Sequence, residues 1–155
     1  MLQPKPVSAS EVIMTQLVLP IHINSLDTIF GGTIMSWIDI AAAISAQRHC
    51  NREVVTASID QLSFYAPVKK GWVVNLKSKV NFVSKTSMEV GVQVTAENPR
   101  SGELFHTSSA YLTFVALDFN SRPTIVPELI LQTDDDRRRF EEGKSRRAAR
   151  LANRK

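Results

Sequence analysis

A single carboxylate stands inside a long apolar segment of this chain. Residues 33–50 contain no proline or glycine and one acidic residue, Asp39. Burying a carboxylate costs free energy unless it is paired or hydrogen-bonded, so Asp39 is either satisfied by a neighbouring strand or kept for chemistry. A partly buried carboxylate is a good general base towards water. The position therefore predicts an acid–base residue.

Two glycines, Gly31 and Gly32, come directly before this apolar segment. The first N–H groups of a helix have no intrahelical acceptor, and the helix N-terminus carries partial positive charge. Because glycine has no Cβ, a substrate can approach such a backbone closely, and its amides can hold a developing oxyanion. The alternative is that the pair merely shapes a tight loop, and spacing alone favours neither. Asn24 lies earlier in the same loop, where Asn is also common for its turn-forming chemistry.

The hydrophobic pattern predicts the elements that position these residues. Residues 33–50 are apolar on nearly every face, which is typical of a buried helix, and residues 11–19 predict a first strand. After the helix the period changes to two, with proline or glycine turns between the segments. The further strands predicted are residues 54–66, 72–83, 88–96 and 103–117.

Alternation along two of these strands predicts one buried face and one wet face. The apolar positions are Val74, Leu76, Val80 and Phe82 on the first strand, and Met88, Val90, Val92 and Val94 on the next. One helix can cover one face of an antiparallel sheet, so we expect an α+β fold. The other face should remain in solvent.

The charge of the chain is concentrated at its end. The formal net charge is +4, but residues 133–155 hold nine Lys or Arg and five Asp or Glu, whereas residues 1–132 hold ten of each. The neutral body argues against a nucleic-acid partner. In the tail, acids precede bases, which suits a helix macrodipole, and Glu142 and Arg146 have i,i+4 spacing. We expect a partly helical, solvated tail; an RNA- or membrane-associated segment is the alternative.

The remaining reactive side chains predict no second centre. Cys50 is the only cysteine, so it has no partner for an intrachain disulfide, and we expect an inert, buried thiol. His22, His49 and His106 lack the spacing of a helical metal pair, and we expect none of them to be catalytic. No metal site is predicted.

Two features of the sequence indicate in which part of the cell the protein is found. No apolar run reaches the ~18–20 residues that a membrane span needs, and residues 1–10 contain no apolar leader region. We therefore expect a cytoplasmic protein without a membrane span.

Several blocks of the sequence, in order, are similar to one family. Residues 24–39, NSLDTIFGGTIMSWID, resemble the active-site segment of hotdog-fold acyl-CoA thioesterases, with closest likeness to the bacterial broad-specificity and brain-type cytosolic acyl-CoA hydrolases. The resemblance covers residues 11–128, which we treat as a single hotdog domain followed by a charged tail, residues 129–155. Further matching blocks are residues 48–51, 54–56, 64–71 and 84–90.

The resemblance implies a fold, a reaction and an assembly. The fold is a curved antiparallel sheet wrapped around one long buried helix, and the reaction converts acyl-CoA and water to free CoA and a carboxylic acid. Asp39 is then the general base or the nucleophile, the amides of Gly31 and Gly32 hold the oxyanion, and Asn24 orients the carbonyl or the water. No cofactor is implied beyond the CoA of the substrate. The family implies a homodimer with active sites at its interface, commonly three dimers in a hexamer.

Other residues are candidates for contacts with the substrate. Thr56 and Ser58, on a strand expected to face the helix, are candidates to hydrogen-bond the water or the thioester, although a plain strand role is as well supported. Phosphates and pantetheine need cations and hydrogen-bond donors. The candidates for binding CoA are Ser84, Lys85, Thr86, Ser87 and Arg122.

Other functions remain open at this level because a fold does not fix a function. One alternative is a non-hydrolytic acyl-CoA binding or sensor module. Another is a hotdog dehydratase, which pairs a histidine with an acid; His22 is the candidate, although Asp39 occupies the thioesterase position.

Overall fold

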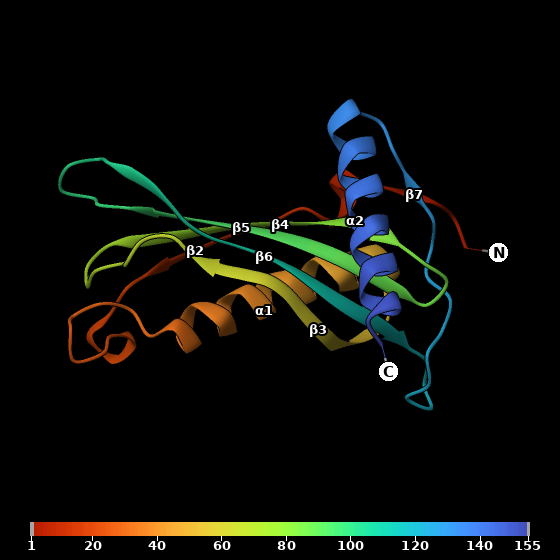
Figure 1. The fold of residues 1–155 in the computed structure, drawn as a ribbon, viewed down its shortest axis with the longest axis horizontal. Coiled ribbons are helices and arrows are strands. Elements are labelled where there is room, and N and C mark those ends of the chain that lie inside the picture. Colours follow the sequence, from red (N-terminus) through yellow and green to blue (C-terminus); the bar gives the residue numbers. More distant parts are fainter. Residues whose placement is uncertain (1, 155) are drawn as a thin grey trace.

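The computed structural model describes residues 2–154, in which a curved five-stranded antiparallel sheet wraps around one long helix (Figure 1). The body contains β2 (Val12–Leu17), α1 (Gly31–Cys50), β3 (Glu53–Phe64), β4 (Val73–Val83), β5 (Ser87–Glu97) and β6 (Leu104–Leu117). Two short 3-10 turns, η1 (Val7–Ser10) and η2 (Pro20–His22), flank β2. The α+β hotdog class expected from the sequence is confirmed.

The sheet order is β2-β4-β5-β6-β3, so β2 and β3 are the two edge strands. The predicted strands agree with the observed ones to within a few residues, except that β2 is shorter than residues 11–19 because a 3-10 turn lies close to each of its ends. The helix begins at Gly31 rather than at residue 33. Outside the body, β1 (Lys5–Pro6) pairs in parallel with β7 (Leu129–Ile130).

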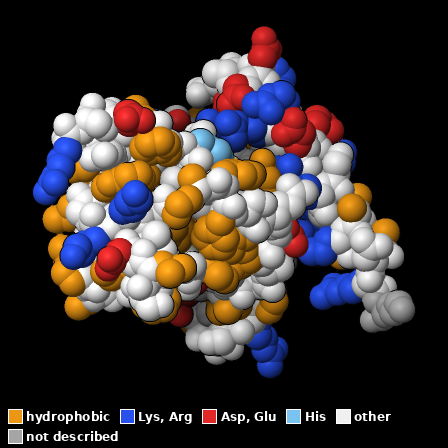
Figure 2. All heavy atoms as spheres, turned by 60° about the vertical axis from the view of Figure 1, so that its left-hand side comes forward, with side chains coloured by type: hydrophobic (Ala, Val, Ile, Leu, Met, Phe, Trp, Pro, Cys, Tyr) orange, Lys and Arg blue, Asp and Glu red, His pale blue; other side chains and the backbone are white. Residues whose placement is uncertain are grey.

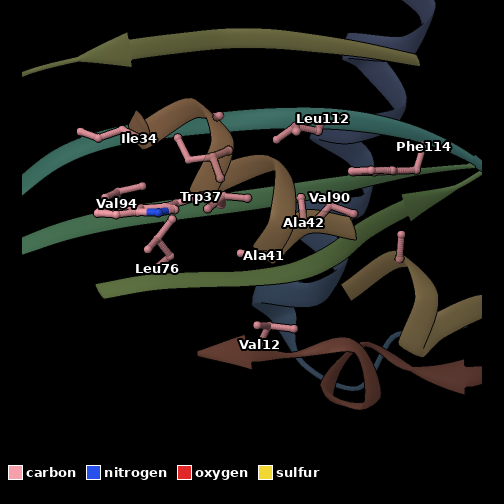
Figure 3. Close-up of a cluster of buried hydrophobic side chains, with 14 of the residues drawn as sticks. Val12, Ile34, Trp37, Ala41, Ala42, Leu76, Val90, Val94, Leu112 and Phe114 are labelled. Atoms are coloured by element: carbon pink, nitrogen blue, oxygen red, sulfur yellow. The ribbon is translucent and has the colours of Figure 1, made fainter. Parts of the chain in front are cut away.

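α1 fills the concave face of the sheet, as the apolar pattern predicts. Its residues Trp37, Ile38, Ala41 and Ala42 are buried, and the two alanines allow the sheet to approach the helix closely. From the sheet, the side chains that point at the helix include Leu76, Val90, Val94, Leu112 and Phe114 (Figure 3). Burying one such large side chain contributes about 1.5–3 kcal/mol, so this face holds the hydrophobic core.

The helix ends where the chain turns out of helical geometry. Asn51 adopts the left-handed conformation, with φ of 53°, and its N–H donates to the carbonyl of Gln47 at 2.7 Å. Lys5 Nζ donates to the carbonyl of Arg48 at 3.0 Å. Carbonyl groups in the last turn, which have no N–H donor inside the helix, are thereby satisfied.

A β-bulge moves one predicted core residue to the opposite face. The register of β4 and β5 shifts between Val80 and Phe82, which places one extra residue, Asn81, in β4. Phe82 therefore lies on the outer face, where its ring contacts that of Phe140 at 4.9 Å between centroids. The prediction that Phe82 shares a face with Val80 was wrong, because strict alternation carries no sign of a bulge.

The charged tail forms a helix, α2 (Asp134–Ala152), that lies across the outer face of the sheet (Figure 1). Gly143 is buried against β4 and β5, and a Cβ at this position would stand 2.8 Å from Phe82 Cβ and 3.0 Å from Glu89 Oε1. The expectations of a solvated tail and a wet outer face were therefore wrong beneath α2.

The predicted ion pair of the tail is also replaced by others. Arg146 binds Glu89 of β5 through two bonds, from Nη2 to Oε1 at 2.8 Å and from Nε to Oε2 at 2.9 Å. Glu142 instead accepts from Arg138 at 3.1 Å. α2 is thus fastened to the sheet by charged side chains as well as by Phe140. No helix within residues 2–154 has an apolar stretch long enough to cross a membrane.

Candidate active site

Asp39 sits at the boundary between the core and the surface. It lies on α1, and Thr56 Oγ1 of β3 donates a hydrogen bond to its Oδ1 at 2.8 Å. Both residues are half-buried. Among residues 2–154, Oδ2 has no hydrogen-bond partner. One carboxylate oxygen is therefore held by the neighbouring strand, while the other is left to accept a proton.

A second bulge separates Thr56 from Ser58. Thr56 pairs with Phe114, which faces α1, whereas Ser58 pairs with Thr113, and Thr113 pairs in turn with Glu89 beneath α2. Residues directly opposite each other in antiparallel strands present their side chains on the same face. Ser58 thus lies on the outer face, away from Asp39, and the expectation that it faces the helix was wrong. The extra residue between the two is Ala57.

The backbone at the start of α1 offers free donors. The N–H groups of Thr33 and Ile34 both donate to the carbonyl of Phe30, at 3.0 and 3.3 Å. Those of Gly31 and Gly32 have no acceptor within residues 2–154, as expected for the first residues of a helix. Two adjacent amides at the positive end of a helix can bind a negative oxygen.

The chain itself does not require glycine at these two positions. Neither has a positive φ. A Cβ at Gly32 would meet nothing within 4 Å, and one at Gly31 would meet Phe64 at 3.6 Å, an ordinary contact. The tight-loop alternative therefore has no support in the backbone conformation. The glycines leave room for a group that approaches from outside the chain.

An open pocket lies beside Gly31. Its volume is about 280 Å³, and it is bounded by the start of α1 and by the chain that follows β3. Its walls are Ile29, Gly31, Ile34 and residues 64–68. A small organic group held by the Gly31 amide would therefore have apolar space next to it.

Asn24 is fixed by the loop that precedes α1. Its Oδ1 accepts from the N–H of Leu26 at 2.8 Å and from both the N–H and the hydroxyl of Thr28 at 3.2 Å. Turn chemistry is thus present, as the sequence suggested. Because the carbonyl oxygen of the side chain is already occupied, the group left for another molecule is the Nδ2 amide, which is a donor only.

The candidate CoA-binding residues gather at the far end of α1. In the β4–β5 turn, Ser84 Oγ and Ser87 Oγ lie 2.6 Å apart. The carbonyls of Lys85 and Thr86 accept from Val126 and Ala116, each at 3.0 Å. These bonds bring the turn alongside the segment that follows β6.

Arg122 lies in that segment, and its N–H donates to Asp118 Oδ1 at 3.0 Å. Lys85 and Arg122 are both exposed, and neither forms an ion pair within residues 2–154. Two unpaired cations are therefore available near the end of the sheet.

Within one chain the predicted site residues form separate groups. The rise of an α-helix is 1.5 Å per residue, which places Gly31 about 12 Å along the axis from Asp39 and the two ends of the 20-residue α1 about 30 Å apart. Asp39 and Thr56 are brought together. Asn24 and the glycines lie at or before the start of the helix, and Lys85 and Arg122 lie beyond its end.

The histidines and the cysteine have other partners. His22 Nδ1 accepts from the N–H of Leu19 at 2.9 Å, and its ring packs edge-on against Trp37. His49 is buried, and its Nε2 lies 2.7 Å from the Pro127 carbonyl; burial lowers its pKa. Burial raises the pKa of the Cys50 thiol, which keeps it protonated and a poor nucleophile.

Phe64 and Tyr65 were missed as candidate site residues. Both lie in the block 64–71 that resembles the family, but an aromatic pair at a strand end carries no signal that separates a pocket wall from a core position. Their exposure is the distinguishing feature: 49% for Phe64 and 61% for Tyr65. Exposed aromatics beside an apolar pocket are typical of ligand sites.

Comparison with known proteins identifies the family. Residues 26–103 match the thioesterase superfamily model. The chain is 44% identical to the uncharacterized acyl-CoA thioester hydrolase YkhA of Bacillus subtilis, over 82% of this chain and 74% of that protein. It is 36% identical to the rat cytosolic acyl coenzyme A thioester hydrolase over 93% of this chain, which spans 38% of the rat protein.

Solved structures agree with these relatives. An apo-hexameric acyl-CoA thioesterase superposes with a TM-score of 0.91 at 40% identity, covering 99% of this chain and 100% of that one. The acyl-CoA hydrolase of Staphylococcus aureus, solved with butyryl coenzyme A, coenzyme A and coenzyme A disulfide, superposes with a TM-score of 0.89 at 34% identity, covering 96% and 92%. The family resemblance is thus confirmed, and the chain belongs to the thioesterase superfamily.

Proposed function

We propose that this protein hydrolyses acyl-CoA thioesters to free CoA and a carboxylic acid, with Asp39 as general base. The observation that carries the proposal is the half-buried carboxylate on α1, with Oδ1 held by Thr56 and Oδ2 left free. The relatives named acyl-CoA thioester hydrolases support the substrate class.

The reaction follows from the chemistry of these groups. Asp39 Oδ2 takes a proton from a water molecule, whose oxygen forms a bond to the thioester carbonyl carbon. The carbonyl electron pair moves to oxygen, and the Gly31 and Gly32 amides stabilise the resulting negative charge. When the carbonyl re-forms, the carbon–sulfur bond breaks, and the CoA thiolate takes the proton from Asp39. Direct attack by Asp39 on the carbonyl is the alternative route.

Asn24 acts as a donor in this scheme. Its side-chain oxygen is held by Leu26 and Thr28, so its Nδ2 amide is the group directed at the substrate. An amide donor polarises a carbonyl but cannot accept a proton from water. We therefore assign Asn24 to the thioester carbonyl rather than to the attacking water.

The site requires two chains. A general base and an oxyanion donor each act within about 3 Å of their target, whereas Gly31 and Asp39 are separated by about 12 Å along α1. A second copy placed against α1 and the edge strand β3 supplies the missing half, so that Asn24 and the glycines of one protomer face Asp39 of its partner. We propose a homodimer, with three dimers forming a hexamer; the similar acyl-CoA thioesterase is hexameric, which supports this assembly.

The proposal also covers the binding of CoA, the need for a cofactor, the compartment and the role of α2. Lys85 and Arg122, with the hydroxyls of Ser84, Thr86 and Ser87, supply cations and donors for the CoA phosphates. The scheme uses no cofactor beyond the CoA of the substrate, and we assign the protein to the cytoplasm. α2 is fastened to the sheet, which favours a structural role over an RNA- or membrane-binding one.

A subunit-mixing experiment tests the reaction and the interface together. Thiol release from acyl-CoA is measured for the wild type, for Asn24→Ala, for Asp39→Ala and for the two variants after mixing and subunit exchange. Each variant alone should lose at least about 100-fold in kcat. In a mixed dimer one active site carries both substitutions and the other carries neither, so thiol release should recover through the unsubstituted site.

No recovery after demonstrated exchange would place both residues in a site within one protomer and contradict the interface. Failure of the wild type to release thiol from any acyl-CoA would instead favour the non-hydrolytic binding module. Full activity of Asp39→Ala would contradict the proposed mechanism.

A further inference from the structure

One aromatic side chain is almost fully exposed at the end of the sheet where β6 ends. Phe119 follows β6 in a tight turn, in which Asp118 Oδ1 accepts from the N–H of Asn120 at 2.8 Å. Phe119 is 97% exposed, the highest value among the large apolar residues of the described range 2–154. Burying an aromatic ring is favourable, and the folded chain leaves this ring in solvent. The ring is therefore available for contact with another molecule.

A cation lies over one face of this ring. Arg52, in the turn between α1 and β3, has its guanidinium carbon 5.6 Å from the centroid of the Phe119 ring, close enough for attraction between the cation and the ring. Arg52 forms no ion pair within residues 2–154. Because Phe119 is so exposed, the opposite face of the ring is open to a planar group.

The ring lies at the same end of the molecule as the two cations assigned to the CoA phosphates. The β4–β5 turn, which contains Lys85, is joined to β6 by the N–H of Ala116, which donates to the Thr86 carbonyl at 3.0 Å. Arg122 follows Phe119 in the turn after β6. Both turns and the end of α1 lie together in Figure 1, whereas the opposite end, which comes forward in Figure 2, gathers apolar side chains on its surface.

The distance from Asp39 to this end of the molecule matches the length of the pantetheine arm. At 1.5 Å per residue, the end of α1 at Cys50 lies about 17 Å along the helix axis from Asp39. About thirteen bonds separate the sulfur of CoA from its first phosphorus, and an extended chain covers ~3.5 Å for every three bonds, which gives about 15 Å. A thioester at Asp39 whose arm runs along α1 therefore places its phosphates, and the adenosine beyond them, near Phe119.

We propose that Phe119, with Arg52 on its other face, is the platform on which the adenine ring of CoA stacks. The contact makes the enzyme select thioesters of CoA over thioesters of phosphopantetheine that lack the nucleotide; the proposal rests on the proposed function. Bases stack on exposed aromatic side chains, and the ribose phosphate beside the adenine requires a cation. A phosphopantetheine thioester, such as one attached to a carrier protein, has no adenine and gains nothing from Phe119.

The kinetic test compares KM for an acyl-CoA with KM for the same acyl group on 4′-phosphopantetheine, both measured by thiol release. Loss of an aromatic side chain on which a base stacks weakens binding by roughly 5- to 150-fold. Phe119→Ala should therefore raise KM for the acyl-CoA about tenfold relative to KM for the phosphopantetheine thioester, and should change kcat less than KM. Phe119→Trp keeps an aromatic surface and should keep the ratio of the two KM values at that of the wild type.

A binding measurement separates the adenine contact from catalysis. The probe is adenosine 3′,5′-bisphosphate, which carries the nucleotide end of CoA without the thiol. In a calorimetric titration, its Kd should be about tenfold weaker for Phe119→Ala than for the wild type. Leu104→Ala is the matched control, because Leu104 is 69% exposed and lies at the other end of β6; its Kd should equal that of the wild type.

An equal rise in KM on both thioesters would show that Phe119 only supports the fold of its turn, and would overturn the proposal. An unchanged KM for the acyl-CoA in Phe119→Ala would also overturn it and leave the hydrolase function intact. If the wild type hydrolyses neither thioester, the proposed function fails, and the titration decides on the platform alone: no binding of the bisphosphate, or equal binding to Phe119→Ala, would then contradict it.

Discussion

The two faces of the sheet carry helices of opposite character. α1 lies against the inner face through apolar contacts, and its one carboxylate keeps a free oxygen at the surface. α2 lies across the outer face and is held by the Arg146–Glu89 pair, by Arg150 on Asp60 at 3.0 Å and by the close approach of Gly143. On the outer face both oxygens of Glu89 accept hydrogen bonds, whereas on the inner face only one oxygen of Asp39 does.

Because of this difference, we expect the outer face to contribute to stability and the surroundings of Asp39 to contribute to activity. Glu89 is 5% exposed and both of its oxygens are bound, so it is not available for proton transfer. Asp39 is half-buried and has one oxygen free. We expect substitutions on the outer face to change the free energy of unfolding and substitutions beside Asp39 to change kcat.

The largest expected effect on stability is on the outer face. Arg146→Ala leaves the buried Glu89 carboxylate without its partner, which costs about 3–5 kcal/mol. Burial lowers the pKa of Arg146, but its hydrogen bonds to Glu89 and the charge of that carboxylate raise it, and the net shift is upward. Denaturant unfolding measures the loss, and Lys144→Ala, an exposed residue of the same helix, serves as control. Equal stabilities of the two variants would remove the distinction between the faces.

A smaller effect is expected on the inner face, and it concerns the rate. Thr56→Val removes the hydroxyl that positions Asp39 and should lower kcat roughly tenfold, while the free energy of unfolding changes by less than about 1.5 kcal/mol. Thr56→Ser retains the donor and should restore most of the rate. A loss of stability without a change in kcat would show that the hydrogen bond serves only the fold.

The smallest expected effect is the pH dependence of the free energy of unfolding that arises from His49, in the last turn of α1. Burial lowers the pKa of His49 in spite of its bond to Pro127, so the unfolded chain binds a proton more readily than the folded one. Its contribution to stability is therefore complete above the unfolded pKa of about 6.5 and is lost as the pH falls below that value, by at most ~1.4 kcal/mol per pH unit. Urea unfolding from pH 5 to 8 should show this slope, and His49→Gln should flatten it.

The difference between α1 and α2 also shows which features can be predicted from the sequence. α1 was predicted because apolar residues on every face require a buried helix, and the strands were predicted because their period is two. α2 was predicted as a helix but not as a packed one, since the residues that dock it are charged or are a glycine. Contacts such as Arg146 with Glu89 join residues 57 positions apart and leave no local pattern.

The two bulges limit how well the sequence predicts which face of the sheet a side chain near the site occupies. In β3 an extra residue, Ala57, follows Thr56, and in β4 an extra residue, Asn81, precedes Phe82. Each extra residue shifts the alternation of side chains between the two faces of the sheet. Neither bulge is marked by glycine or proline, so the face of Ser58 and of Phe82 was predicted wrongly. Asp39, Gly31 and Asn24 were selected as candidates because a lone acid in an apolar helix and a glycine pair before it are local signals. In the proposed dimer, the distances between them across the site depend on a second chain.

The central claim is that the free oxygen of Asp39 takes the proton of the attacking water. Asp39→Asn preserves the shape of the side chain and an oxygen that can accept from Thr56, but it removes the base. Thiol release from an acyl-CoA at saturating concentration is the direct measurement. We expect kcat to fall by a factor of about 10² to 10⁴ with the free energy of unfolding nearly unchanged, and a kcat within twofold of the wild type would contradict the account.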